Sequence, residues 1–197
     1  MTAPGELRSE AATFLSRRLQ PAIFNHSRRV YELAKAIAEH EGCAVDLDAL
    51  HIASLFHDAG TADEYDGPQR FEIEGADAAA AFLADQGWDA HRIDDVWEAI
   101  ALHTSPQIAE RRGPLTRYLR LGVRTDFGDL TLLPGAEIRR VEIQRTYPRL
   151  MIEKVLEDAV VSQALRNENK APSASWPAAL LQAHRSDPGR PGISPAF

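Results

Sequence analysis

The chain has 197 residues, of which 44% are hydrophobic and 26% charged, a composition typical of one compact globular domain with a core of its own. Its 22 Lys and Arg residues against 29 Asp and Glu residues give a formal net charge of −7, which argues against a broad nucleic-acid surface. A single cysteine excludes an intramolecular disulfide and no run of about 18 apolar residues occurs, so we expect a cytoplasmic protein that contacts neither nucleic acid nor membrane.

Apolar residues recur mainly at intervals of three and four, and regular alternation is scarce. This period predicts helices rather than strands, and therefore an all-α fold. Proline, glycine and capping residues separate the expected helices, which in chain order cover residues 6–18, 23–41, 47–57, 72–86, 90–103, 115–127, 136–144 and 148–166, with a short one from 176.

Three polar residues precede apolar helical segments and are expected to cap them: Asp46, Asp89 and Ser175. Residues 61–71 are expected to form a loop, because Asp-Gly-Pro at 66–68 is strong turn chemistry. We therefore expect an N-terminal helix (1–20) packed on a main helical domain (21–167). A C-terminal extension (168–197) would hold a short helix and a flexible, partly disordered end.

Metal-binding residue types gather in segments that are expected to be buried. His57 and Asp58 end an apolar helix, which places an imidazole and a carboxylate side by side. Both are suitable ligands for a divalent transition metal. His26 lies near the start of another apolar helix and Asp126 near the end of a third. Because an unpaired buried charge is costly, one metal shared by these side chains would explain all of them.

Other interpretations of individual residues stay open. Asp126 could instead cap its helix or pair with Arg124, and Asp129 is a competing ligand close by. Glu72 could be an ordinary charge in the first turn of a helix. His103, at the end of an apolar helix, could simply pack in the core.

The order H…HD…D resembles that of the HD superfamily of metal-dependent hydrolases over about residues 20–180. More narrowly, the segments 25–31 (NHSRRVY) and 55–61 (LFHDAGT), with Phe71-Glu72, are similar to the cyanamide hydratase-like branch. The resemblance implies an HD-domain helical bundle. It also implies one divalent transition metal, zinc in the first place and iron in the second, held by His26, His57, Asp58 and Asp126.

The resemblance further implies the remaining site residues. Asp58, Glu72 and His103 are the expected catalytic residues, with Asp58 or Glu72 relaying a proton and His103 holding the substrate. The residues expected to contact a small-molecule substrate are Arg29, Thr61 and Phe71. No histidine lies between Asp58 and His91, so a second metal is not expected.

The function implied by the branch is the addition of metal-activated water to a small nitrile-like substrate such as cyanamide. One alternative is a metal-dependent phosphohydrolase of nucleotides or related esters, with Arg28, Arg29, Arg70 or Arg124 neutralising the phosphate. Another is a non-catalytic HD module that binds a small ligand. A homodimer stays open, since the Ala-rich segment 72–86 and Trp176 could either form an interface or belong to one core.

Overall fold

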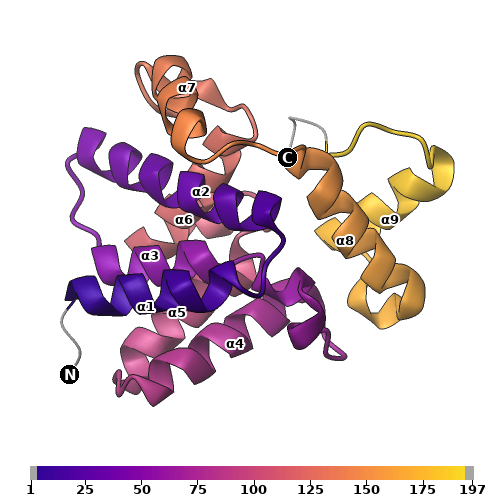
Figure 1. Ribbon diagram of the computed structural model, residues 1–197, viewed down its shortest axis with the longest axis horizontal. Coiled ribbons are helices and arrows are strands. Elements are labelled where there is room, and N and C mark those ends of the chain that lie inside the picture. The colour runs from indigo at the N-terminus through magenta and orange to yellow at the C-terminus, as the bar shows by residue number, and fades with distance from the viewer. Residues whose placement is uncertain (1–3, 194–197) are drawn as a thin grey trace.

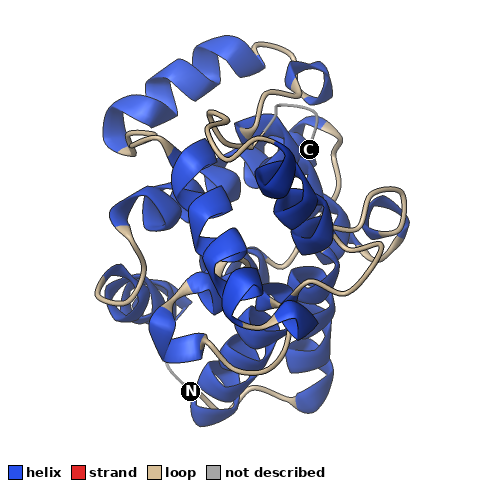
Figure 2. Cartoon of the chain, turned by 90° about the vertical axis from the view of Figure 1, so that its right-hand side faces the viewer, coloured by secondary structure: helices blue, strands red, loops and turns tan. Residues whose placement is uncertain are grey.

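The computed structural model describes residues 4–193, and these form helices, turns and loops with no strand among them (Figure 2). The all-α prediction is confirmed. The α-helices are α1 (Pro4–Ser16), α2 (Pro21–His40), α3 (Leu47–Phe56), α4 (Phe71–Asp85), α5 (Ala90–Leu102), α6 (Pro114–Asp126), α7 (Ala136–Thr146), α8 (Ile152–Arg166) and α9 (Trp176–Ser186).

The expected caps are present because each side chain satisfies free backbone N–H groups of a first turn. Asp46 accepts from the N–H groups of Asp48 and Ala49 at the start of α3. Asp89 accepts from Arg92 N–H at α5, and Ser175 from Ala178 N–H at α9. These local bonds fix where the helices begin, as predicted.

Helix α2 is central to the bundle and packs against both α3 and α6, while α4 packs on α5 (Figure 1). The approach of α6 to α2 depends on Gly122. A Cβ at this position would lie 2.7 Å from the Val30 carbonyl oxygen and 2.8 Å from Ala34 Cβ. The missing side chain therefore lets the two backbones touch, and this contact sets α6 in position beside the residues of α2 that face the centre.

The segment after α3, expected as a loop, contains two short 3-10 turns, Ala59–Thr61 and Asp63–Tyr65. The first is pressed against α4, since a Cβ on Gly60 would lie 2.0 Å from the Phe71 carbonyl oxygen. Only glycine fits there. The turn that carries Asp58 is thereby fixed against the start of α4.

Helix α8 begins at Ile152 rather than at Pro148, the expected start. Leu150 and Met151 adopt left-handed backbone angles, with φ of 51° and 58°, and these interrupt the helical pattern. Such angles are unfavourable for residues with a branched or long side chain. Both side chains are exposed. The apolar residues that predicted an earlier start of α8 are therefore not buried at these positions.

The C-terminal part lies against α8 as far as the structure describes it. Helix α9 packs on α8, and the N–H of Ile193 donates to the carbonyl oxygen of Glu153. Residues 187–193, expected to be extended or disordered, are thus held by this contact, and the last four residues lie outside the described part. Among the described helices, none has both the length and the apolar character to cross a membrane.

Candidate metal centre

His57 and Asp58 occupy the two positions directly after α3. His57 is the C-cap residue of that helix, and its Nδ1 donates to the Ser54 carbonyl oxygen at 2.8 Å. This bond turns the other ring nitrogen, Nε2, towards the inside of the bundle. The Thr61 hydroxyl donates to the Asp58 carbonyl oxygen at 2.6 Å and holds the turn that follows. The local chain therefore fixes both side chains before any other helix contributes.

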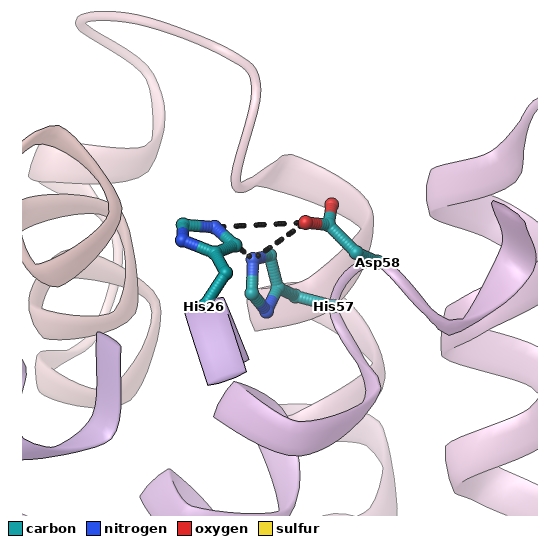
Figure 3. A group of neighbouring side chains, drawn as sticks. All are labelled: His26, His57 and Asp58. Atoms are coloured by element: carbon teal, nitrogen blue, oxygen red, sulfur yellow. Dashed lines mark hydrogen bonds and ion pairs between the residues drawn. The ribbon is translucent and has the colours of Figure 1, made fainter. Parts of the chain in front are cut away.

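His26 reaches the same point from α2, and three ligand atoms converge there (Figure 3). His26 Nε2 lies 3.2 Å from His57 Nε2 and 3.6 Å from Asp58 Oδ2. His57 Nε2 lies 3.2 Å from the same carboxylate oxygen. All three residues are buried, so their side chains are shielded from bulk solvent. The structure thus brings together three of the four residues predicted as ligands.

The tautomers of His26 and His57 indicate which kind of ligand the three converging atoms suit. Nδ1 of His57 donates to a carbonyl, and Nδ1 of His26 lies 2.7 Å from a carboxylate oxygen of Asp126. A neutral imidazole that donates through Nδ1 carries a lone pair on Nε2. The two Nε2 lone pairs then face each other and Asp58 Oδ2, a buried oxygen that accepts no hydrogen bond. A divalent cation fits this set of donors.

The pKa values of Asp58, His26 and His57 are shifted by burial and by the contacts among these residues. Burial alone would raise the pKa of the Asp58 carboxyl, but His57, His103 and His26 hold that pKa well below its usual range. Burial lowers the pKa of His26. Burial also opposes charge on His57, yet Asp58 beside it leaves the pKa of His57 raised. The ionised carboxylate of Asp58 is the form that binds a cation.

Asp126, predicted as a fourth ligand, lies next to His26 rather than within the group of three. Its Oδ2 contacts His26 Nδ1, and Arg29 donates to both of its carboxylate oxygens, each at 2.8 Å. Arg149 donates to Oδ1 at 3.2 Å. Burial raises the pKa of the Asp126 carboxyl, but His26 and Arg29 lower it far more, so it is held ionised. Its contacts are those of a group that orients His26.

Arg29, expected to contact substrate, is fully enclosed instead. Its Nη1 donates to the carbonyl oxygens of Tyr147 and Pro148, and its other nitrogens donate to Asp126. The guanidinium therefore joins α2, the end of α6 and the segment before α8. These hydrogen bonds are directed at Asp126, Tyr147 and Pro148, not at the three ligand atoms.

His103, the C-cap residue of α5, lies on the other side of Asp58. Its Nε2 is 3.5 Å from Asp58 Oδ1, and its Nδ1 donates to the Ile100 carbonyl oxygen at 2.6 Å. The His103 ring lies edge-on to the rings of His57 and Phe71, with centroids 4.9 and 5.7 Å apart. His103 and Phe71 thus lie where a group that contacts the substrate is expected.

Glu72 is buried at the start of α4, and both of its carboxylate oxygens are engaged. Arg70 donates to the two oxygens at 2.9 and 2.5 Å, and the Thr104 hydroxyl donates at 2.7 Å. A carboxylate neutralised in this way is poorly suited to relay a proton. It instead ties α4 to the residue that follows His103, which supports the placement of that histidine.

Two residues near the centre, Arg149 and Trp176, make contacts that the sequence did not predict. Arg149 lies between helices and joins Asp126 only after the chain has folded. Trp176 was expected to start a capped helix and to belong either to an interface or to the core, and its ring lies 5.8 Å from that of Phe71. Both contacts join residues far apart in the chain, and neither follows a helical or strand period.

Comparison with known proteins gives a family match over most of the chain. The model of the family described as HD domain matches residues 23–175. One solved structure, described as a predicted HD superfamily hydrolase from an uncultured Thermotogales bacterium, is 28% identical, with a TM-score of 0.44. The match covers 72% of this chain and 76% of that one. No curated protein matches the chain.

Proposed function

The chain belongs to the HD domain family, and from this premise we propose that it is a metal-dependent enzyme that activates water at the centre of His26, His57 and Asp58. The observation that carries the proposal is the convergence of two imidazole Nε2 atoms and one buried carboxylate oxygen within 3.2 to 3.6 Å. A divalent transition metal bound there would lower the pKa of a water molecule and supply a nucleophile at neutral pH. Zinc is our first choice and iron the second, because mixed imidazole and carboxylate donors suit both.

For the substrate, we propose a small uncharged nitrile-like molecule such as cyanamide. The surroundings of the centre support this choice, since the Phe127 ring lies beside His26 and the Phe71 ring beside His103. All four arginines considered for phosphate binding have partners: Arg28 with Tyr147, Arg29 with Asp126, Arg70 with Glu72, and Arg124 with Glu110 and Asp129. A small closed site with occupied arginines suits a neutral molecule better than a nucleotide.

The proposed reaction adds the elements of water across the C≡N bond: oxygen bonds to carbon, and protons reach the nitrogen. Cyanamide would give urea. His103 Nε2 and Asp58 Oδ1 lie 3.5 Å apart, and this pair is proposed to transfer a proton to the substrate nitrogen. The fixed Nδ1 of His103 leaves its Nε2 to meet the substrate, while Asp126 and Arg29 keep the His26 ring turned towards the metal.

Phosphohydrolysis is the second candidate, and one observation favours it. Arg70 also pairs with a carboxylate, that of Glu72, but its side chain is 25% exposed and its Nη2 lies 3.2 Å from the Thr104 hydroxyl, beside His103. This guanidinium could turn towards a phosphate if it released Glu72. The two candidates differ in product, so urea formation and phosphate release measured on the same preparation separate them.

The first test is the metal content of untagged protein purified without chelators, compared with that of Asp58→Ala. We expect about one transition metal per chain in the natural protein and a loss of most of it in the variant. Asp95→Ala is the matched control, since Asp95 also pairs with a histidine but on the exposed face of α5. A natural protein that binds no metal would leave a non-catalytic ligand-binding module as the better interpretation.

A further inference from the structure

The proposed centre is enclosed. The exposed fractions of His26, His57, Asp58 and His103 are each 1% or less. A substrate of several heavy atoms cannot contact these side chains unless part of the chain moves. We therefore asked which segment covers the centre and how that segment is held.

A stack of rings leads from the centre to the C-terminal part of the chain. Phe71 lies against His103, and Trp176 lies against Phe71 with ring centroids 5.8 Å apart. Trp176 is the first residue of α9 and directly follows the part of the chain that the family model matches. We call residues 163–186, from the end of α8 through α9, the cover.

The cover is fastened to the loop after Asp58 by polar contacts. Lys170, itself 3% exposed, donates to Asp66 Oδ1 at 2.6 Å and to the Gly67 carbonyl oxygen at 2.8 Å. Arg166 donates to Asp66 Oδ2 at 2.7 Å. We call Asp66, Lys170 and Arg166 the latch. One further bond joins Gln163 Nε2 to the Gly60 carbonyl oxygen at 2.9 Å. In Figure 1, α8 and α9 form the right-hand part of the molecule.

These fastenings are of a kind that can open without unfolding the bundle. Water and salt compete for the Arg166–Asp66 pair, whose side chains are 53% and 24% exposed, far more effectively than for packed apolar side chains or the buried Lys170.

We propose that residues 163–186 are a gate, that the latch on Asp66 holds it shut, and that Trp176 forms part of the wall met by the substrate. This proposal rests on the proposed function for the identity of the centre. It adds that entry and exit of both metal and substrate require the latch to open. The contacts of this segment with Asp66 would then control access.

The test measures how fast a chelator removes cobalt(II) from cobalt-loaded full-length protein. Asp66→Asn removes the charge that both latch cations contact, and we expect release about fivefold faster, which corresponds to about 1 kcal/mol of lost latch energy. Glu168→Gln is the matched control, since Glu168 pairs with Arg185 of the cover but lies outside the latch. The amount of cobalt bound at equilibrium should be equal in all three proteins.

A second measurement needs no variant. High salt should speed cobalt release from the natural protein because it screens the latch, and Asp66→Asn should respond much less. Equal release rates for the natural protein and Asp66→Asn, with no difference in salt response, would overturn the gate. Reduced cobalt content in Asp66→Asn would also overturn it, because the loop would then support the centre itself. Faster release without urea formation would keep the gate and reject only the proposed substrate.

Discussion

At the scale of single residues, the orientation of His26 depends on a carboxylate that lies behind it. Asp126 receives two hydrogen bonds from Arg29 and contacts His26 Nδ1, so His26 Nε2 points to the other ligand atoms. Partners of this type fix both the tautomer and the direction of a metal-binding histidine. The sequence predicted Asp126 as a fourth ligand, and its contacts with His26 and Arg29 are also those of a group that orients a ligand.

Substitution at this carboxylate separates the two roles. Asp126→Asn keeps an oxygen that can accept from His26 Nδ1, so we expect metal affinity to fall only about 10- to 100-fold if Asp126 orients His26. Arg29→Gln should weaken binding in the same direction, and Arg124→Gln on α6, whose partners are Glu110 and Asp129, should not. Calorimetric titration with zinc measures this. No detectable binding by a folded Asp126→Asn would make Asp126 a ligand.

His51 provides a pH-dependent contribution to stability that is independent of the metal. Burial, with Arg28 and Arg8 nearby, lowers its pKa to about 3 from the ordinary value of 6.5. The unfolded chain therefore binds the proton first as the pH falls. The stability that depends on neutral His51 is complete above pH 6.5 and is lost as the pH falls towards 3.

We expect His51→Gln to flatten the pH dependence of unfolding. Between pH 6.5 and 4 the natural protein should lose about 1.4 kcal/mol per pH unit more than the variant. Urea denaturation at several pH values gives this difference, because the other histidines titrate in both proteins. His91→Gln, at a histidine whose side chain is 85% exposed, is the control. Parallel curves for His51→Gln and the natural protein would contradict the expected pKa.

At the scale of helices, the contact between α2 and α6 depends on Gly122. Gly122→Ala would place a Cβ 2.7 Å from the Val30 carbonyl oxygen, so we expect α6 to shift and the protein to lose about 1–3 kcal/mol of stability. Metal affinity should fall as well, because Asp126 moves with α6. Gly113→Ala, at the N-cap of the same helix with no atom within 4 Å, is the matched control. Thermal unfolding with and without zinc checks both effects.

The helices also show which features were open to prediction. Capping residues and apolar periods act within one segment, so the starts of α3, α5 and α9 could be predicted from neighbouring residues. The start of α8 could not, since Leu150 and Met151 adopt left-handed angles although neither is a glycine or asparagine that would mark such a turn.

At the scale of the whole molecule, the sequence identified the residues of the candidate site by their type but not the contacts that surround them. His26, His57 and Asp58 were found because charged groups in apolar segments need a partner. The pairing of Glu72 with Arg70, the ring of Trp176 and the latch at Asp66 were not found. Those contacts join surface-exposed residue types across the fold, and no period or spacing marks them.

The enclosure has a consequence for which ion the protein carries. All three ligand atoms come from residues 26–58, whereas the cover, residues 163–186, follows them in the chain and is synthesised later. A centre that closes after it is filled exchanges slowly, and its occupant then reflects the ions present during folding as well as the order of affinities. Expression in zinc-rich or iron-rich medium would therefore leave a lasting record in the purified protein.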